Sequence, residues 1–371
     1  MAQSDGAAKI RIGVIFGGRS AEHEVSLASG AGIMGRLDRE RYEVLPVLVT
    51  REGRWRLLPR PEAEPGEGRE AFLFPRPGEF SLQAVGPTGS PEPIPVDVFF
   101  PITHGTYGED GTLQGLLELT EIPFVGSSCF SSALAMNKAA AKKVLLAAGL
   151  SALPAAAIPR ERWEAGRKAV LQEIHARIGY PLFVKPVSLG SSVGIHHIEG
   201  KDEEALDRAV RDALTYDHAV LIEADAEGRE IECAVLEDSA GAPLLASPLA
   251  EIRPKEGWYD YEAKYTEGKT DILIPAPLPE DVAERIRAQA GAAFSALGCS
   301  GLARVDFFFR EESGEIFVSE LNTLPGFTPM SAYPMMIEAT GIPYPTMLDR
   351  LIACALSRHK RNEARNFRRL G

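Results

Sequence analysis

Acidic, basic and amide side chains stand at alternate positions in the stretch ARVDFFFREESGEIFVSELNT. The stretch predicts two β-strands joined by a three-residue loop at 312–314, with glycine in the left-handed position. That loop would place Asp306 opposite Glu320 and Arg304 opposite Asn322. Because side chains alternate between the two faces of a strand, all four would project from one face. This face is the first candidate for chemistry.

Two facing carboxylates disfavour such a hairpin unless something balances their charge. At a separation of about 5 Å and an effective dielectric near 20, they repel by roughly 3 kcal/mol. A divalent cation would reverse the sign. The oxygen donors of Asp306, Glu320 and Asn322 suit Mg²⁺ or Mn²⁺ held together with substrate phosphates. The alternative is a solvated polar face on which Arg304 neutralises the two acids.

A loop of small residues at 187–194 follows the apolar run that ends at Lys185. Its glycines let backbone N–H groups approach phosphate oxygens, and Ser191 and Ser192 add hydroxyl donors, so the loop could form a phosphate lid. It matches neither the Walker A pattern nor GxGxxG, and a plain surface turn is the alternative. Lys138, near the start of its helix, reads in isolation as a solvated lysine.

Two acids flank a turn further along the chain. Glu223 ends one predicted strand and Glu230 opens the next, a place where a nucleotide can lie between two domains. Ordinary turn acids are an equally good interpretation of this pair.

Polar residues also follow the first predicted strands. Glu22 in GGRSAEHEVSL falls in the first turns of a helix that Ser20 can cap; the helix dipole favours a carboxylate there, which could receive a ligand ammonium. His104 and the acids at 109–110 follow a strand end, the usual position of ligand groups in α/β sheets. A lone histidine is more often structural.

A tyrosine-rich segment, GWYDYEAKY, contains Lys264 and Tyr265 between predicted strands and could close over a site. The elements around these residues alternate between strand and helix, which predicts an α/β fold with a parallel sheet in its first part. Segment 59–95, rich in Pro, Gly and Glu, predicts an insertion of loops and short edge strands. Strands are predicted at 10–16, 42–49, 96–101, 181–185 and 219–223, and helices at 112–119, 131–148, 203–214 and 280–297.

Composition excludes several classes of protein. The 371 residues are 45% hydrophobic with a net charge of -12, which argues against intrinsic disorder and against nucleic acid as a partner. At roughly 150 residues per domain, the length allows two or three domains. No window of about 18 apolar residues predicts a membrane span, and the first apolar run is too short for a signal peptide. Four cysteines without CxxC spacing suit reduced thiols in the cytoplasm. The basic tail at 358–369 is expected to be a solvated helix end rather than a docking site for an acidic partner.

Six motifs, taken together, resemble the D-alanine:D-alanine ligase family of ATP-grasp enzymes. They are GGRSAEHEVSL, HGTYGEDGTLQG, VKPVSLGSSVGI, YDYEAKY, ARVDFF and ELNTLPGFT, and they follow the family's order and approximate spacing across 12–351. The resemblance implies three α/β domains, at 1–126, 127–223 and 224–371, with ATP between the second and third. It also implies a homodimer, and a cytoplasmic role in supplying peptidoglycan precursors.

The resemblance implies a role for each matching residue. Those on the nucleotide side are Lys138 and Lys185 at the ATP phosphates with Ser191, Ser192 and Lys264, Glu223 near the adenine, Glu230 at the ribose, and Asp306, Glu320 and Asn322 at two Mg²⁺ or Mn²⁺ ions. Those on the amino acid side are Glu22 at the first ammonium with His104 nearby, Lys264 and Ser331 at the second carboxylate, Arg304 and the Gly326 N–H at the oxyanion, and a hydrogen-bonded set of Glu22, Ser191 and Tyr265.

In such ligases the γ-phosphate passes to the carboxylate of the first D-alanine, and the amine of the second attacks the acyl phosphate. Tyr265 favours an amine over D-lactate as the nucleophile, because relatives that use D-lactate depart from tyrosine there. Ala332 stands where the family more often has a larger apolar residue, which leaves D-serine open as second substrate, and Thr103 replaces a more usual apolar residue before His104. Another ATP-grasp carboxylate–amine ligase and a non-catalytic nucleotide sensor are the remaining alternatives.

Overall fold

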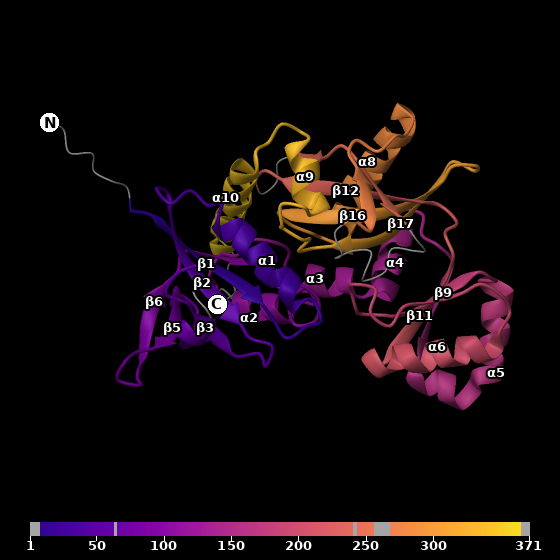
Figure 1. The fold of residues 1–371 in the computed structure, drawn as a ribbon, viewed down its shortest axis with the longest axis horizontal. Helices are drawn as coiled ribbons and strands as arrows, with labels where there is room; N and C mark the ends of the chain where they lie inside the picture. Colours follow the sequence, from indigo (N-terminus) through magenta and orange to yellow (C-terminus); the bar gives the residue numbers. More distant parts are fainter. Residues whose placement is uncertain (1–7, 63–64, 240–242, 256–267, 365–371) are drawn as a thin grey trace, which may run out of the picture.

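The computed structural model describes residues 8–62, 65–239, 243–255 and 268–364. Three α/β units, each built on its own sheet, lie around a common centre (Figure 1). The first unit is indigo, the central unit magenta, and the C-terminal unit orange to yellow. Across the described ranges, no helix combines the length and apolarity that crossing a bilayer requires.

The first unit has a seven-stranded sheet in the order β6-β5-β4-β3-β2-β1-β7. Its buried strand β1 pairs in parallel with both β2 and β7, as the alternating pattern predicted. The 59–95 insertion adds short antiparallel strands at the sheet edge, which confirms that prediction. The elements are β1 (Ile10–Gly17), α1 (His23–Met34), β2 (Tyr42–Val49), β3 (Trp55–Leu57), a 3-10 turn (Pro65–Glu67), β4 (Arg69–Phe72), β5 (Ser81–Val85), β6 (Pro91–Pro95), β7 (Val98–Pro101) and α2 (Thr112–Thr120).

The helix predicted at 131–148 is two helices, α3 (Cys129–Met136) and α4 (Lys138–Ala147). Asn137 separates them with an extended backbone, and its side chain caps α4 by accepting a hydrogen bond from the Ala140 N–H at 2.9 Å. An amide that can bond to its own neighbouring backbone competes with a continuous helix at this position. The break places Lys138 at the first residue of α4.

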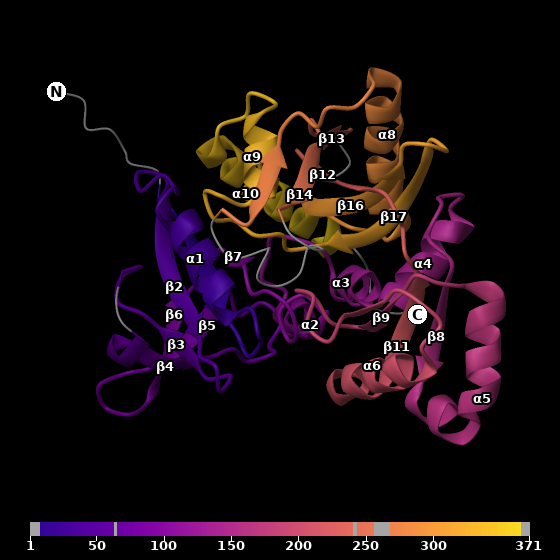
Figure 2. The same ribbon diagram turned by 45° about the vertical axis from the view of Figure 1, so that its right-hand side comes forward.

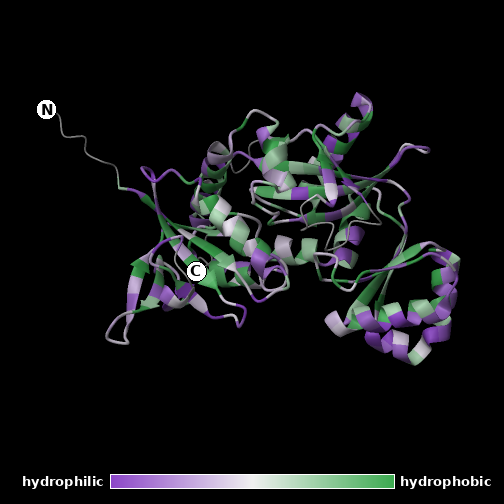
Figure 3. Ribbon diagram, viewed as in Figure 1, coloured by the Kyte–Doolittle hydropathy of each residue, from purple (hydrophilic) through white to green (hydrophobic). Residues whose placement is uncertain are grey.

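The central unit is a four-stranded antiparallel sheet in the order β10-β9-β11-β8. Two helices, α5 and α6, bury one of its faces, and their outer surfaces are hydrophilic (Figure 3). The other face carries Lys185 and Glu223. The elements are β8 (Ala155–Pro159), α5 (Arg160–Arg177), β9 (Leu182–Pro186), β10 (His196–Ile198), α6 (Glu203–Tyr216) and β11 (Ala219–Ala224).

The C-terminal unit is built on a six-stranded sheet that α8 covers on one side. Gly298 follows α8 with a φ of 66°, the left-handed conformation with which glycine commonly ends a helix. The elements are β12 (Arg229–Glu237), β13 (Leu244–Ala246), β14 (Ala250–Pro254), β15 (Thr270–Leu273), α8 (Glu280–Ala296), β16 (Leu302–Arg310), β17 (Glu315–Asn322), α9 (Ala332–Glu338) and α10 (Tyr344–Glu363).

The hairpin of β16 and β17 has the predicted pairs at its functional end. Arg304 lies opposite Asn322 and Asp306 opposite Glu320. The loop, however, has four residues, because β16 ends at Arg310 and β17 begins at Glu315. A bulge at Ser319 restores the register, since Phe307 pairs with Val318 while Asp306 still pairs with Glu320.

The first and C-terminal units share one hydrophobic core. Residues of β1, α1 and β7 pack with residues of α9 and α10, and the rings of Phe100 and Phe327 meet edge to face with centroids 6.0 Å apart. Both views show α3 and α4 reaching from the first unit toward the central unit beneath the C-terminal sheet (Figures 1 and 2). The three units therefore meet around a single centre.

Candidate active site

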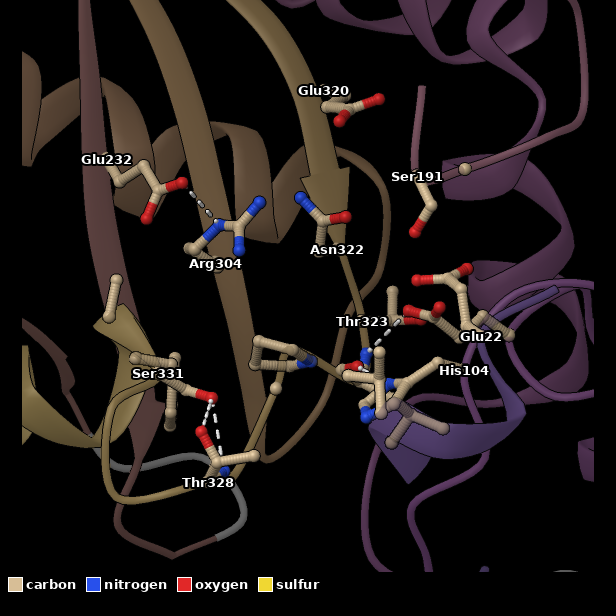
Figure 4. A pocket seen from close by; sticks show the side chains of 18 of the residues that line it. Glu22, His104, Ser191, Glu232, Arg304, Glu320, Asn322, Thr323, Thr328 and Ser331 are labelled. Atoms are coloured by element: carbon tan, nitrogen blue, oxygen red, sulfur yellow. Dashed lines mark hydrogen bonds and ion pairs between the residues drawn. The ribbon is translucent and has the colours of Figure 1, made fainter. Parts of the chain in front are cut away.

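A cavity of about 590 Å³ lies where the three units meet. The first unit contributes Glu22 and His104, the central loop contributes Ser191, and the C-terminal hairpin contributes Arg304 and Glu320 (Figure 4). The cavity brings together residues from Glu22 near the start of the chain to Tyr333 near its end. Lys264 and Tyr265 lie outside the described residues.

Arg304 lines the cavity, and the buried carboxylate of Asp306 holds its guanidinium. The guanidinium donates to both carboxylate oxygens of Asp306 at 2.7 Å, and the Asn322 amide donates to Asp306 Oδ2 at 2.9 Å. Arg304 Nε also lies 3.2 Å from Oε1 of Glu232, a buried acid on β12. Sequence reasoning missed Glu232, whose only signal is its position opposite Asp306 across β12 and β16.

Glu320 faces a lysine from the central part of the chain. Lys138 Nζ lies 3.0 Å from Glu320 Oε2 and donates to the Leu189 carbonyl at 2.8 Å. Lys138 therefore ties the C-terminal hairpin to the base of the 188–194 loop. The alternative to a metal site expected Arg304 alone to neutralise the two acids on a solvated face. In the structure Arg304 pairs with Asp306 and Lys138 pairs with Glu320, and the face is partly buried.

The donor set on this face fits a magnesium or manganese ion that shares substrate oxygens. Two carboxylates and one amide oxygen project from neighbouring strands, and these hard oxygen donors suit such ions. Among the described residues, no group of three or more His, Cys, Asp or Glu side chains could enclose a metal alone. Phosphate oxygens would have to complete the coordination, which is how Mg²⁺ is commonly bound at nucleotide sites.

A second ion-pair cluster lies on the face of the central sheet that α5 and α6 do not cover. Lys185 Nζ is 2.7 Å from Glu223 Oε2, and Lys142 Nζ pairs with Glu223 Oε1. Burial acts to raise the pKa of Glu223, but the two ammonium groups outweigh it and hold the pKa at about 2. Burial likewise acts to lower the pKa of Lys185, and the surrounding carboxylates, Glu223 first and then Glu320 and Glu230, raise it instead.

Lys142 is a residue that the sequence reasoning missed. It lies one helical turn after Lys138 on α4, and that spacing places both side chains on one face of the helix. Strand β12 begins at Arg229, one residue before the predicted start at Glu230, and Glu230 pairs across the sheet with Phe308 and Ile252. Among the described residues predicted to contact ATP, Lys185 and Glu223 lie together on the central sheet, and the charge of Glu230 on β12 also acts on Lys185.

The loop after Lys185 has an uncommon backbone. Ser191 and Ser192 have φ values of 50° and 57°, in the left-handed region that residues other than glycine rarely adopt. Ser191 points toward Glu22 across the cavity (Figure 4). At Gly190 a Cβ atom would lie 3.4 Å from Glu22 Oε2, so the loop passes close to the first unit. Strain at such positions is typical of ligand-binding loops.

Glu22 lies at the start of α1, but not within it. The helix begins at His23, and Ser20 does not cap it, which corrects both predictions. Instead the Ser20 hydroxyl accepts from the Glu22 N–H at 3.2 Å and donates to the His104 carbonyl at 2.7 Å. This turn holds Glu22, which is 9% exposed, at the cavity wall.

His104 and Glu109 connect the first unit to the segment after β17. His104 Nδ1 lies 3.0 Å from the Leu324 carbonyl, and Nε2 lies 3.0 Å from the Ser29 hydroxyl. Burial lowers the pKa of His104. Glu109 accepts from the Gly105 and Leu324 N–H groups, at 2.7 Å and 3.3 Å. Burial, followed by the charge of Glu22, raises the pKa of Glu109 to about 8.

Gly326 and Ser331 lie on the loop between β17 and α9. The Ser331 hydroxyl accepts from the Thr328 N–H at 3.0 Å and lies 2.8 Å from the Thr328 hydroxyl (Figure 4). A Cβ atom at Gly326 would lie 2.7 Å from Ser331 Oγ, so only glycine fits there without a shift. Ala332 lines the cavity and is 8% exposed. Thr103, in the segment after β7, is buried at 3% exposure beside Gly108.

Sheet order and site chemistry together define the class of this protein. Its central antiparallel sheet and its C-terminal sheet carry lysines and acids on facing surfaces, and the solved structures that match this fold are ATP-grasp ligases. Family models described as D-ala D-ala ligase N-terminus and C-terminus match residues 11–127 and 144–353. The chain belongs to the D-alanine–D-alanine ligase family.

Individual relatives agree over nearly the whole chain. D-alanine–D-alanine ligase A of Mesorhizobium japonicum is 43% identical over 363 residues, covering 95% of this chain and 99% of the relative. The D-alanine–D-alanine ligase of Geobacillus thermodenitrificans is 40% identical, covering 96% and 98%.

Two solved structures share the fold. The D-alanine-D-alanine ligase of Coxiella burnetii has a TM-score of 0.83 and 36% identity, covering 96% of this chain and 97% of its own. The VanG D-Ala:D-Ser ligase of Enterococcus faecalis has a TM-score of 0.84 and 36% identity, covering 94% and 100%. Members of this family are ATP-dependent ligases that use divalent metal ions, and their substrates are small molecules.

Proposed function

We propose that this protein joins two D-alanine molecules into D-alanyl-D-alanine, at the expense of ATP, for peptidoglycan precursor synthesis. One observation supports the proposal above the others. Glu22, a carboxylate suited to an amino acid ammonium, lines the same cavity as Arg304, Glu320 and Asn322, which are suited to phosphate and metal. An amino acid and a phosphoryl group could therefore meet there.

The nucleotide would lie between the central and C-terminal sheets. Lys138 and Lys185 would contact its phosphates with Ser191 and Ser192, Glu223 would face the adenine region, and Glu230 the ribose. Asp306, Glu320 and Asn322 would hold two Mg²⁺ or Mn²⁺ ions, which would counter the charge of the transferring phosphoryl group. On nucleotide binding, Lys138 would exchange its contact with Glu320 for one with phosphate.

The first chemical step would be phosphoryl transfer. Glu22 would bind the ammonium of the first D-alanine, whose carboxylate oxygen attacks the γ-phosphorus of ATP. That P–O bond forms as the bond to ADP breaks, which yields an acyl phosphate and ADP. Holding both reactants in one cavity would contribute much of the rate enhancement, because phosphoryl transfer needs positioning and charge stabilisation from the protein rather than covalent chemistry.

The second step would form the peptide bond. The amine of the second D-alanine attacks the acyl carbon, and its excess proton leaves with the phosphate. Arg304 and the Gly326 N–H would stabilise the oxyanion of the tetrahedral intermediate, a role that typically supplies a large catalytic term. Ser331 and Lys264 would bind the second carboxylate, while Glu22, Ser191 and Tyr265 would link the first unit to the lid.

Phosphate release from Mg·ATP, with product masses, tests this function. D-alanine alone should stimulate release and yield its dipeptide, whereas L-alanine should not. A mixed product with D-serine would point to the subsite at Ala332, and such activity is named for the VanG structure that shares this fold. A mixed product with D-lactate would overturn the role given to Tyr265. No stimulation by any D-amino acid would refute the ligase reaction.

We further propose that the chain works as a cytoplasmic homodimer with domains at 1–126, 127–223 and 224–371. The separate sheets support the domain boundaries, and three buried cysteines and one partly buried cysteine, all free thiols, suit a reducing compartment. Sedimentation equilibrium at micromolar concentration would test the dimer: a mass of one chain would refute it. Limited proteolysis would test the boundary at 223, with cleavage expected in the exposed turn at 227–228 that follows β11.

A further inference from the structure

The segment 324–327, which carries Gly326, is held by side chains of the first unit. The Phe327 N–H donates to the Ser29 hydroxyl at 3.1 Å, and the Leu324 carbonyl lies 3.0 Å from His104 Nδ1. A third hydrogen bond, between the Ser29 hydroxyl and His104 Nε2 at 3.0 Å, joins these two contacts into one continuous chain of hydrogen bonds. The two ends of this chain of hydrogen bonds therefore bracket Gly326 on either side.

The chemistry of the end groups fixes the direction of every bond. A carbonyl oxygen only accepts, so His104 Nδ1 must carry the hydrogen that bonds to Leu324. In a neutral imidazole Nε2 then accepts, so the Ser29 hydroxyl donates to Nε2 while it accepts from the Phe327 N–H. Burial lowers the pKa of His104, which keeps the ring in this neutral form.

Both ring nitrogens of His104 are therefore committed to protein atoms. A substrate group could bond to His104 only by displacing Ser29 or the Leu324 carbonyl. Ser29 is fully buried and His104 is 3% exposed, so neither has room to turn away without disturbing the shared core. His104 therefore has no ring nitrogen left to bind a substrate directly.

We propose that Ser29 and His104 are positioning residues, which hold the Gly326 N–H where the oxyanion of the tetrahedral intermediate forms. The inference rests on the proposed ligase function and deepens it. The first unit, which would bind the first D-alanine through Glu22, thereby also fixes a donor of the C-terminal unit. Substrate and oxyanion donor are then placed by one rigid body.

Two further contacts hold the same segment. The Tyr344 hydroxyl donates to the Phe327 carbonyl at 2.5 Å. A Cβ atom at Gly32 would lie 2.6 Å from that carbonyl oxygen, so α1 approaches the segment as closely as a glycine allows. Loss of the Ser29 hydroxyl should therefore shift the segment slightly without releasing it.

Ser29→Ala tests the proposal, with Ser26→Ala as a matched control. Ser26 is equally buried one turn earlier on α1, and its hydroxyl also makes two hydrogen bonds, with the Gly17 N–H at 2.8 Å and the Ile102 carbonyl at 2.6 Å. Those bonds stay within the first unit. Dipeptide formation by the wild-type protein is measured first, so that failure of the ligase function is recognised separately.

Ser29→Ala should lower kcat by about tenfold to a hundredfold, because misplacing an oxyanion donor weakens the transition state more than the ground state. The KM for ATP should stay within about twofold, and binding of a phosphinate dipeptide that mimics the tetrahedral intermediate should weaken by the same factor as kcat. Ser26→Ala should lose comparable thermal stability and keep its kcat. Ser29→Thr, which retains the hydroxyl, should recover much of the loss.

The proposal is overturned if Ser29→Ala and Ser26→Ala change kcat and phosphinate binding alike. A double variant, Ser29→Ala with His104→Gln, gives a second test even where a single variant folds poorly. If both residues act through one chain of hydrogen bonds, the kcat of the double variant should be no lower than that of the less active single variant. Multiplied losses would show that His104 acts separately from Ser29.

Discussion

Asp306 is the residue on which the charge balance of the cavity depends, because it accepts hydrogen bonds from Arg304 and Asn322 together. Asp306→Ala should reduce dipeptide formation by at least about a thousandfold, since it removes a metal donor and releases Arg304 from its position. Phosphate release at increasing Mg²⁺ concentration measures the effect. Glu315→Ala is the control, because Glu315 lies on the same hairpin but is exposed at the turn. Near wild-type turnover in Asp306→Ala would refute the metal assignment.

Glu109 makes the stability of the protein depend on pH. Its pKa rises from an ordinary value of 4.5 to about 8 in the folded state. The folded protein therefore retains a proton that the unfolded chain releases, so this contribution to stability is full below about pH 4.5 and is lost as the pH rises through about 8.

Comparison with Glu109→Gln isolates this contribution. Relative to the variant, the free energy of unfolding of the wild-type protein should fall by about 2 kcal/mol between about pH 5 and pH 8, after a discount for partial exposure. Urea unfolding at each pH gives the difference between the two proteins. A constant difference across that range would contradict the raised pKa.

At the scale of elements, the break between α3 and α4 sets the position of Lys138. Asn137→Ala removes the cap of α4 and should cost about 1 kcal/mol of stability. It should also raise the KM for ATP severalfold, because Lys138 is the first residue of the helix. Asp202 caps α6 through the Glu204 and Ala205 N–H groups. Asp202→Ala, the matched control, should cost similar stability and leave the KM unchanged; equal KM values in the two variants would count against the role of Lys138.

Patterns within one element predicted most of the framework. The pairing of Asp306 with Glu320 followed from the two-residue period of strands, and the bulge at Ser319 compensated for a loop one residue longer than predicted. The break at Asn137 was missed because the residues on both sides favour helix, and one amide decides the outcome. Such competition between a side chain and its backbone leaves only a weak trace in a sequence.

Contacts between elements far apart in the chain were the part that the sequence could not predict. Lys142 lies within helix α4, and the packing of that helix against the central sheet brings it to Glu223. Glu232 and Arg304 lie on neighbouring strands, β12 and β16, of the C-terminal sheet, and no local pattern indicates that these two strands pair. Ser29 reads as one small residue of a helix rich in small residues. The roles of Lys142, Glu232 and Ser29 depend on tertiary contacts, whereas the motif residues around them could be recognised from single segments of the sequence.

At the scale of the whole molecule, Arg358 of α10 joins the C-terminal unit to the segment that leaves the first unit. Its guanidinium donates to the Phe124 carbonyl at 2.7 Å and to the Gly126 carbonyl, and it lies 4.9 Å from the centre of the Phe124 ring. Burial lowers the pKa of Arg358, because the charged guanidinium is partly removed from water. The two carbonyl groups replace part of the lost hydration and hold the side chain in place. The basic end of α10 is therefore not simply a solvated tail, since its first arginine fixes the junction.

Arg358→Ala should reduce the free energy of unfolding by about 2–3 kcal/mol, because two backbone carbonyls lose a charged donor and an aromatic ring loses its cation. Arg361, exposed on the same helix, is the control, and Arg361→Ala should change stability by less than about 0.5 kcal/mol. If the junction couples the units, the urea transitions of Arg358→Ala followed by circular dichroism and by tryptophan fluorescence should separate. Coincident transitions with unchanged stability would show that the shared core alone holds the first and C-terminal units together.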